Sequence, residues 1–267
     1  MVELTIVDDP GDARFAQFRL NERGLASRAE KRDDAGAGLF LAEGDLVVER
    51  ALDAGCRPTA ALIDAERVPP VAERLTAAGA PLYGGGEEVR RVVSGLGMPQ
   101  NVLALFERPA RPSVAELASR CHRLVVLEGV DNPVNVGSVV RNAAGLGWDG
   151  LVLDHTSADP LARRALRVAM GTAFTLPHAR TTDLPGALAQ LADTGVELYA
   201  MTPAPDAVDL GDVQPSERAA VLIGSERAGL SAELIALAQP VQIPMSGGVD
   251  SLNAAAATAI ACWALRP

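Results

Sequence analysis

The stretch RLVVLEGVDNPVNVGSVVRNAAGLG, residues 123–147, decides how the chain folds. It opens with an apolar run at 123–130, which is typical of a buried strand. Two asparagines, a proline, a patch of small residues and a single arginine, Arg141, follow where an α/β protein changes from strand to helix. The stretch therefore predicts a strand, a polar turn and a helix that begins near Val134.

The same alternation of strand and helix continues to the end of the chain. Apolar runs predict further strands at 150–154, 175–179, 196–203, 219–226 and 240–245. Helices are predicted to begin near Pro160, Leu184, Ser231 and Ser251. This alternation predicts an α/β fold with a parallel sheet that helices cover on both faces.

The first part of the chain predicts a smaller α/β domain. Residues 14–34 are charged and helical in composition, and 38–55 are typical of a strand, an acidic turn and an amphipathic helix. Strands are also predicted at 59–64, 80–85 and 101–109, with a helix at 68–79. Because the stretch RPARPS at 108–113 is typical of a linker, we place one domain at 1–110 and a second at 111–267.

Composition limits the function classes. The 267 residues are 48% hydrophobic and 22% charged, which is the profile of a soluble globular protein with a full core. The N-terminus lacks the pattern of a secretion signal, and no segment reaches the roughly 18 consecutive apolar residues of a membrane span, so we expect a cytoplasmic protein without a membrane partner. Cys56, Cys121 and Cys262 are scattered, without CxxC spacing, and are predicted to be small buried side chains.

The net charge of −10 argues against a general binder of polyanions, because phosphate contacts come from Lys and Arg. Two basic stretches are nevertheless candidates for a local RNA-binding surface, although each is also explained as a solvated helix face. The first comprises Arg14, Arg19, Arg23, Arg28, Lys31 and Arg32, and the second comprises Arg163, Arg164, Arg167 and Arg180.

Several familiar sites are excluded. A P-loop needs a lysine after its glycines, but the single lysine, Lys31, lies outside any glycine-rich loop. Gly145–Gly150 matches GxGxxG, yet it follows a predicted helix and precedes a strand, the reverse of the order in dinucleotide-binding folds. The histidines His122, His155 and His178 are too scattered for a metal cluster, and no GxSxG elbow presents a nucleophilic serine. We therefore expect no metal site.

Three clusters of polar and small residues remain, at 132–142, 223–231 and 243–257, each at the carboxyl end of a predicted strand. Helix caps and turns explain each cluster taken singly. In open parallel sheets, however, ligands bind outside the carboxyl ends of the strands. The three clusters are therefore predicted to converge on one pocket.

The ordered trio resembles the motifs of the SpoU (TrmH-like) RNA 2′-O-ribose methyltransferases of the SPOUT class, over about residues 120–265. The motifs read Asn135-Val136-Gly137 with Arg141, then Ile223-Gly224-Ser225-Glu226 with Gly229-Leu230, then Ile243-Pro244-Met245 with Ser251-Leu252-Asn253. The segment FLAEG at 40–44 makes the first domain similar to the L30e-like substrate-binding module often placed ahead of this catalytic domain. The resemblance implies a deep trefoil knot, an S-adenosyl-L-methionine cofactor, an RNA substrate, and a homodimer whose active site takes residues from both subunits.

The resemblance also assigns the site. It implies that the catalytic residues are Asn135, Arg141, Glu226, Ser251 and Asn253, and that the cofactor contacts are Thr202, Leu222, Ile223, Gly224, Ile243, Met245, Ser251 and Leu252. Because a guanidinium is a poor general base, we interpret Arg141 as a group that holds the substrate phosphate and polarises the 2′-hydroxyl. The asparagines and Ser251 suit the orientation of a ribose or of Arg141, and Glu226 suits the fixing of Arg141 or a backbone amide.

The chain departs from the family pattern in three places. Arg227 stands where glycine is common, an alanine run at 254–257 follows Asn253, and Ala169 stands where serine is frequent. The alanines favour a helix but have small side chains, so we expect them to affect cofactor affinity and not the geometry of the helix. Loss of the hydroxyl at Ala169 puts one RNA or cofactor contact in doubt.

These observations favour methylation of 23S ribosomal RNA, a preference that depends on the L30e-like module alone. A tRNA 2′-O-methyltransferase is the alternative enzyme, although its single-domain members usually lack such a module. A catalytically silent RNA-binding or ribosome-assembly factor is the alternative from another class, and a methyl acceptor other than RNA is a third. The two basic stretches are the predicted RNA-binding surface.

Overall fold

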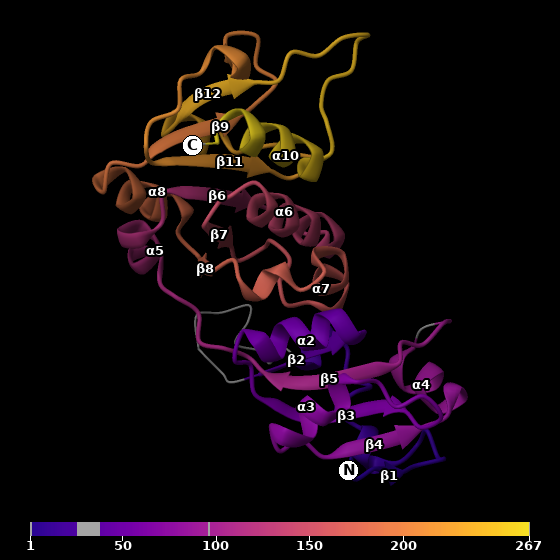
Figure 1. Ribbon diagram of the computed structural model, residues 1–267. Coiled ribbons are helices and arrows are strands. Elements are labelled where there is room, and N and C mark those ends of the chain that lie inside the picture. The colour runs from indigo at the N-terminus through magenta and orange to yellow at the C-terminus, as the bar shows by residue number, and fades with distance from the viewer. Residues whose placement is uncertain (1, 26–37, 96, 267) are drawn as a thin grey trace. The chain divides into compact units, whose positions relative to one another are not determined.

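The computed structural model describes residues 2–25, 38–95 and 97–266 (Figure 1). The chain forms two compact units. The first consists of Met1–Ala110 together with Leu161–Phe174, and the second consists of Arg111–Pro160 and Thr175–Pro267. The segment Leu161–Phe174 therefore belongs to the first unit by its contacts, although the residues on either side of it belong to the second.

The second unit is built on a parallel sheet, as predicted. All neighbouring strands in its seven-stranded order, β10-β12-β9-β11-β6-β7-β8, run parallel. The strands are β6 (Arg123–Glu128), β7 (Gly150–Asp154), β8 (His178–Thr181), β9 (Glu197–Met201), β10 (Val208–Asp209), β11 (Ala219–Gly224) and β12 (Gln239–Gln242).

The position predicted for β8, 175–179, is wrong at its start. The strand begins at His178, which pairs with Leu151 of β7. Pro177, just before it, has no N–H to donate to a ladder and contributes only its carbonyl oxygen, which accepts from the N–H of Leu151 at 3.0 Å.

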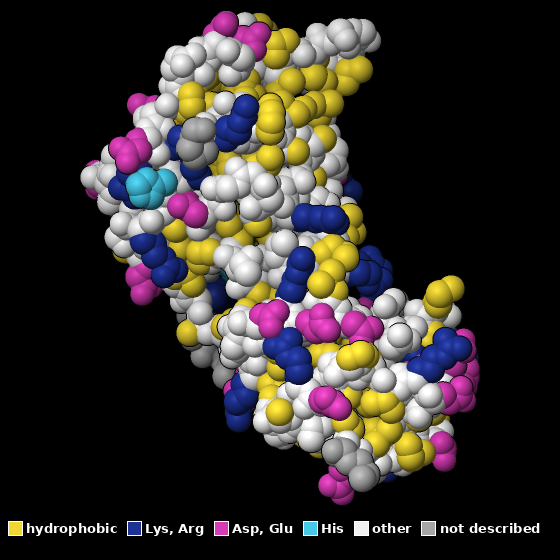
Figure 2. All heavy atoms as spheres, viewed as in Figure 1, with side chains coloured by type: hydrophobic (Ala, Val, Ile, Leu, Met, Phe, Trp, Pro, Cys, Tyr) yellow, Lys and Arg dark blue, Asp and Glu magenta, His cyan; other side chains and the backbone are white. Residues whose placement is uncertain are grey.

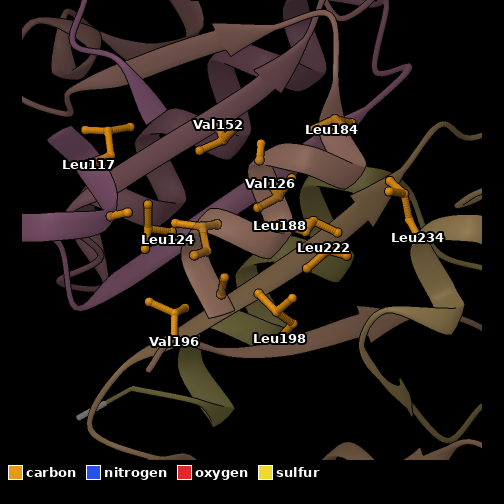
Figure 3. Close-up of a cluster of buried hydrophobic side chains, with 14 of the residues drawn as sticks. Leu117, Leu124, Val126, Val152, Leu184, Leu188, Val196, Leu198, Leu222 and Leu234 are labelled. Carbon is orange, nitrogen blue, oxygen red and sulfur yellow. The ribbon is translucent and has the colours of Figure 1, made fainter. Parts of the chain in front are cut away.

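Helices cover both faces of this sheet. They are α5 (Val114–Arg120), α6 (Pro133–Gly145), α8 (Leu184–Asp193), α9 (Ala232–Ala236) and α10 (Ala254–Ala264), with a short 3-10 helix, η4, at Leu210–Asp212. One buried cluster brings side chains of α5, α8 and α9 onto alternate strand residues such as Leu124, Val126 and Leu222 (Figure 3). The residues between them, such as Val125, are buried against the opposite face, where α6 and α10 pack on each other. The GxGxxG match at Gly145–Gly150 joins α6 to β7, in the order predicted.

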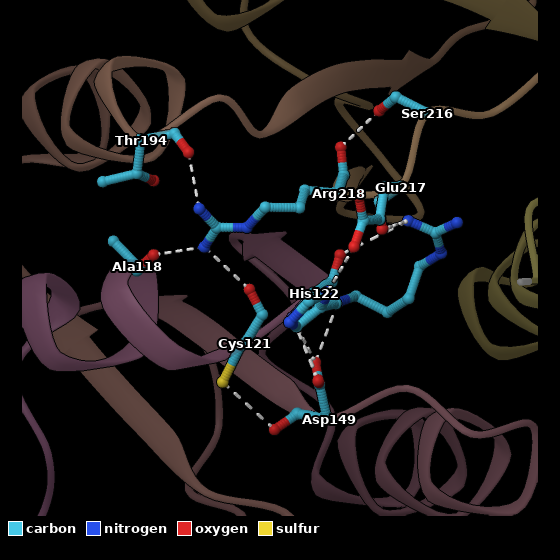
Figure 4. A network of polar contacts seen from close by, with 9 residues as sticks. Ala118, Cys121, His122, Asp149, Thr194, Ser216, Glu217 and Arg218 are labelled. Carbon is cyan, nitrogen blue, oxygen red and sulfur yellow. Dashed lines mark hydrogen bonds and ion pairs between the residues drawn. The ribbon is translucent and has the colours of Figure 1, made fainter.

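Polar contacts fasten the amino ends of the central strands (Figure 4). Arg218, next to β11, donates to the carbonyl oxygens of Thr194 and Cys121. The Asp149 carboxylate accepts the backbone N–H of Arg123 at 2.8 Å. These contacts hold together the edge of the sheet opposite the carboxyl ends, where the polar clusters lie.

The first unit has a mixed five-stranded sheet of order β1-β4-β3-β5-β2, in which β5 is antiparallel to both neighbours. Its elements are β1 (Thr5–Ile6), η1 (Ala13–Phe15), α1 (Glu22–Leu25), β2 (Leu39–Glu43), α2 (Asp45–Asp53), β3 (Pro58–Asp64), α3 (Val71–Ala77), β4 (Leu82–Gly85), α4 (Glu87–Ser94), β5 (Val102–Glu107), α7 (Arg163–Ala169) and η3 (Thr172–Phe174). Identification of this unit as an L30e-like RNA-binding domain stays a prediction, as does that of 111–267 as the catalytic domain.

The expectation of helix over 14–34 is wrong for residues 16–21, which lie between η1 and α1 outside any helix. Phe15 and Phe18 are both fully buried, with their rings edge to face at 6.1 Å. The Arg19 guanidinium turns back onto the carbonyl oxygens of Pro10, Gly11 and Asp12. Burial of both rings and these contacts favour a turn over a continuous helix. Residues 26–34 lie outside the described residues.

A buried carboxylate holds α7 in the first unit. The Glu43 side chain, at the end of β2, is only 2% exposed and forms ion pairs with Arg163 and Arg167. Arg163 also donates to the carbonyl oxygen of Ser94 at 2.9 Å. The helix ends at Met170, whose φ of 53° is left-handed and whose carbonyl oxygen accepts from Arg50 at 2.5 Å. The contacts that define the first unit thus include charged groups that the sequence alone assigned to RNA.

Candidate functional site

Asn253 joins the three clusters that were predicted to converge. Its side-chain nitrogen, Nδ2, donates to Asn135 Oδ1 at 3.1 Å and to Glu226 Oε1 at 2.5 Å. Asn135 lies on α6 and Glu226 follows β11, so each residue comes from a different cluster. The three clusters therefore meet at the carboxyl edge of the sheet, but their predicted convergence on one pocket is met only in part, because no residue of 132–142 lines the cleft described below.

Helix capping fixes the asparagines. Asn253 is the N-cap of α10, and its Oδ1 accepts from the N–H groups of Ala255 at 3.0 Å and Ala256 at 3.3 Å. At the start of α6, Asn132 caps the helix and Pro133 occupies its first turn, which leaves Asn135 buried inside the fold. Because both ends of the Asn253 amide are engaged, it cannot rotate without losing a cap and two bridging contacts.

The loop that leads from β6 into α6 is held by Asp154, at the end of β7. Its carboxylate accepts from the N–H of Gly129 at 3.1 Å, and Ser157, which donates to the same carboxylate, accepts from the N–H of Val130 at 3.0 Å. Burial would raise the pKa of Asp154, but hydrogen bonds from Ser157, Thr156 and Gly129 outweigh burial and hold that pKa below its usual value. The carboxylate stays charged and keeps the entry to α6 in place.

Glu226 stands on a tight turn, Ser225–Gly229. The N–H of Gly229 donates to the carbonyl oxygen of Ser225 at 2.9 Å, and the N–H of Ala228 donates to Ser225 Oγ at 3.1 Å. Gly224, just before the turn, packs so closely that a Cβ there would lie 2.1 Å from the carbonyl carbon of Gly229. Gly229 has a φ of +66°, a conformation that suits glycine. The turn is therefore fixed by backbone contacts that a larger residue at 224 would break.

A cleft of about 470 Å³ opens between these segments. Its apolar lining comes from residues such as Ile223, Ile243, Met245 and Leu252, and its polar lining includes Thr202, Ser225 and Ser251. The volume lies in the range of roughly 300–1,000 Å³ that is common for sites of small ligands and cofactors.

Most predicted cofactor residues line this cleft. They are Thr202, Ile223, Gly224, Ile243, Met245, Ser251 and Leu252. Leu222 does not: it is fully buried in the core beneath, among the side chains of Figure 3. Alternation along β11 explains the difference, because neighbouring residues of a strand point to opposite faces.

Arg141 and Asn135 are not among the residues that line the cleft. Asn135 reaches the site through Asn253. Arg141 lies on α6 with an exposed side chain. The structure therefore brings Asn135, Glu226 and Asn253 together with most of the cofactor residues, but leaves Arg141 outside the cleft of its own chain.

The predicted RNA-binding residues are largely engaged in internal contacts. Besides Arg19, Arg163 and Arg167, Arg14 pairs with Asp12 at 2.6 Å, and Arg180 donates to carbonyl oxygens including that of Ser157. Arg164 is exposed on α7. Arg23 lies in α1, but its side chain, like the whole of Arg28, Lys31 and Arg32, lies outside what the structure describes. Among the described members of the two basic stretches, most guanidinium groups are thus engaged with carboxylates or carbonyl oxygens of the same chain.

Two charged residues that line the cleft, and one carboxylate next to it, had not been predicted in the site. Asp250 and Arg227 line the cleft, and the Glu128 carboxylate accepts the N–H of Ser231 at 2.7 Å beside it. Arg227 and Asp250 lie inside the polar clusters, so their position in the sequence was the available signal. Glu128 is the last residue of an apolar strand, where a lone carboxylate could have been noticed.

Within the described residues, no group of three or more His, Cys, Asp and Glu side chains is placed to hold a metal ion. No described helix is both long and apolar enough to cross a bilayer. Ala169, where serine had been expected, is fully buried in the first unit.

Comparison with known proteins agrees with this geometry. Residues 122–263 match the model of the SpoU rRNA Methylase family. An uncharacterized tRNA/rRNA methyltransferase of Mycobacterium bovis is 40% identical over 264 residues, which cover 96% of this chain and 90% of that protein. The 23S rRNA (guanosine(2553)-2′-O)-methyltransferase RlmP of Bacillus subtilis is 29% identical over 238 residues, 88% of this chain and 92% of that protein.

Among solved structures, the AdoMet-bound rRNA methyltransferase from Sinorhizobium meliloti is similar over 98% of this chain and 97% of its own, with a TM-score of 0.83 and 26% identity. The family match contains α6, the Ser225–Gly229 turn and Asn253, and so covers every hydrogen bond that joins the three clusters. The chain belongs to the SpoU rRNA methylase family.

Proposed function

We propose that this protein transfers a methyl group from S-adenosylmethionine to a ribose 2′-hydroxyl of RNA, and that 23S ribosomal RNA is its substrate. The observation that carries the proposal is the Asn253 amide, which joins Asn135 and Glu226 beside a cleft of cofactor size. Membership of a family of RNA methylases supplies the reaction class.

The cleft residues fit the cofactor. Side chains of Ile223, Met245 and Leu252 form apolar walls of the kind that suit an adenine ring. Gly224 leaves no room for a side chain beside the turn, so ligand contacts there come from backbone groups. The similar structure from Sinorhizobium meliloti is described as AdoMet-bound, which supports the same cofactor for this chain.

When bound, S-adenosylmethionine supplies a methyl group already activated by a sulfonium. The protein then has to align the ribose and allow the hydroxyl proton to leave, and alignment alone contributes up to roughly 7–11 kcal/mol in favourable cases. Asn253 and Glu226 orient the groups at the mouth of the cleft. Arg141 binds the substrate phosphate and polarises the 2′-hydroxyl, whose proton leaves to phosphate or solvent.

A homodimer completes the site in this proposal. Arg141 is exposed on α6 and does not line its own cleft, so it serves the cleft of a second copy. Hydrophobic side chains gather over α10 (Figure 2), where Ile260 is 40% exposed and Trp263 is 58% exposed. The trefoil knot expected of the family stays a prediction.

Ribosomal RNA is favoured over tRNA because RlmP, described as a 23S rRNA enzyme, matches this chain along most of both sequences. The similarity covers more residues than the second unit contains, so it extends into the first unit and supports a role of that unit in holding a large RNA.

The test is transfer of labelled methyl from S-adenosylmethionine to unmodified 23S ribosomal RNA and, separately, to unmodified tRNA, each with wild type and Arg141→Ala. We expect Arg141-dependent label in the ribosomal RNA. Label in tRNA alone would show that tRNA is the substrate, while the proposed methyl-transfer reaction would stand. No label in either, with cofactor bound in calorimetry, would favour a silent RNA-binding or assembly factor.

A further inference from the structure

The Ser225–Gly229 turn carries two neighbouring charged side chains, and only one of them has a partner. Glu226 accepts from Asn253. Arg227 is exposed and forms no hydrogen bond or ion pair with any described residue. It lines the cleft, so an unengaged guanidinium stands at the edge of the proposed cofactor site.

The backbone beneath Arg227 is rigid. The Gly229-to-Ser225 hydrogen bond at 2.9 Å and the Ala228-to-Ser225 Oγ bond at 3.1 Å close the turn on both sides of it. The 2.1 Å separation between a Cβ at Gly224 and the Gly229 carbonyl carbon leaves no space for the turn to shift toward β11. A side chain on a fixed turn loses little backbone conformational entropy when it binds a ligand.

Charge around the cleft favours an anionic ligand for Arg227. The other charged residues that line the cleft are Glu226 and Asp250, both acidic, and the chain as a whole has a net charge of −10. A polyanion that approaches this edge meets two carboxylates, so a cation is needed there to offset the repulsion. A guanidinium also matches a phosphate in geometry, because its donors bind two oxygens at once.

We propose that Arg227 binds a backbone phosphate of the RNA next to the target ribose. The inference rests on the proposed function, because it needs an RNA strand at the mouth of the cleft. Arg227 is exposed at the edge of the cleft, where an RNA strand can approach it, and binding of the cofactor carboxylate instead is the alternative that the test distinguishes. Arg227 is a positioning residue: it sets where the strand lies, while Asn253 and Glu226 orient the groups that react.

The experiment compares wild type, Arg227→Gln, Arg227→Lys and the control Arg120→Gln, which removes the same charge from an exposed position on α5 outside the cleft. Binding of unmodified 23S ribosomal RNA is measured at several salt concentrations, and binding of S-adenosylmethionine by calorimetry. We expect Arg227→Gln to weaken RNA binding about tenfold and to lower the slope of log K against log salt by about 1. Arg227→Lys should keep that slope and recover only part of the affinity, because lysine lacks the paired donors.

Cofactor affinity should be unchanged in all variants, and Arg120→Gln should match wild type in every measurement. A loss of cofactor affinity with unaltered RNA binding would overturn the inference and assign Arg227 to the cofactor carboxylate. Wild-type RNA affinity and salt slope in Arg227→Gln, while wild type methylates RNA, would overturn it as well. If wild type neither binds RNA nor transfers methyl, the proposed function itself fails, which distinguishes the two failures.

Discussion

Asn253 performs two tasks that a single substitution can separate. Its oxygen caps α10, and its nitrogen holds Asn135 and Glu226. The cap explains the residue from local helix chemistry alone, whereas the bridging contacts have meaning only in the assembled site.

Asn253→Asp tests the second task. The carboxylate still caps α10, but it cannot donate to Asn135 and it adds a negative charge beside Glu226. We expect helix content to be kept and methyl transfer to fall by about 10- to 100-fold, the range expected from loss of a hydrogen bond to a charged group. Circular dichroism and methyl transfer measured together check this. Full activity in the variant would mean that the bridging contacts are not needed.

His178 links stability to pH. Burial lowers its pKa from 6.5 to about 4, with Arg111 and Arg180 also lowering it and Asp159 opposing them. As pH falls from 6.5 toward 4, the unfolded chain takes up a proton that the folded chain refuses, so stability decreases in that range. The cost is on the order of 2–3 kcal/mol.

Urea unfolding of wild type and His178→Leu at pH 8 and pH 5 measures this cost. The variant should lose less stability between the two pH values than wild type does, whatever its stability at pH 8. Equal losses in both proteins would show that the drop does not come from this histidine.

At the scale of elements, local patterns predicted most of the second unit. Apolar runs bounded by glycine and proline located β6, β7, β9 and β11, because buried parallel strands carry their signal within a few residues. The start of β8 was missed because a proline stood inside the apolar run. The convergence of the polar clusters followed from strand direction alone, but the partners of each side chain did not, since they depend on contacts across more than 100 residues, as between Asn135 and Asn253.

The roles of the arginines could not be predicted for the same reason. In the sequence alone, Arg163 and Arg167 have no visible partner. The structure places Glu43 beside them, which lies 120 residues before Arg163 and 124 residues before Arg167. The composition of the helix shows that these residues are charged, but it does not show which carboxylate they pair with. A charged stretch therefore predicts an RNA surface poorly unless its partners are known.

Glu43→Gln tests this element. Loss of the buried carboxylate leaves two guanidinium groups without their partner, and we expect unfolding of the first unit to cost roughly 2–4 kcal/mol less. Hydrogen exchange should rise in α7. The matched control is Glu107→Gln, which breaks the exposed pair with Arg57 and should cost under about 1 kcal/mol. Equal effects of the two substitutions would show that Glu43 does not hold α7.

At the scale of the whole molecule, packing within the chain does not explain the exposed apolar side chains over α10. Ile260 and Trp263 project from this helix with 40% and 58% of their surface exposed, and Val134 on α6 is 41% exposed. Exposed apolar side chains on two helices that pack together are typical of an interface between subunits. This surface and the exposed position of Arg141 both favour the proposed homodimer.

Trp263→Glu should convert a dimer to a monomer in sedimentation and reduce methyl transfer about as much as Arg141→Ala. Met98→Glu is the control, because Met98 is 83% exposed but lies in the first unit. A dimer that survives Trp263→Glu would place the interface elsewhere.

The segment Leu161–Phe174 also has a consequence for how the protein can be taken apart. Because this segment completes the first unit while its chain runs on into the second, the linker at Ala110–Arg111 is not the only covalent connection between them. A protease that cuts the linker yields two fragments. The fragment that begins at Arg111 still contains α7, with Arg163 and Arg167, which pair with Glu43 of the other fragment. Fragments made this way would copurify, and a gene shortened at the linker would produce a second unit whose helix α7 lacks its partners. The first unit can therefore be exchanged between relatives only together with the segment Leu161–Phe174.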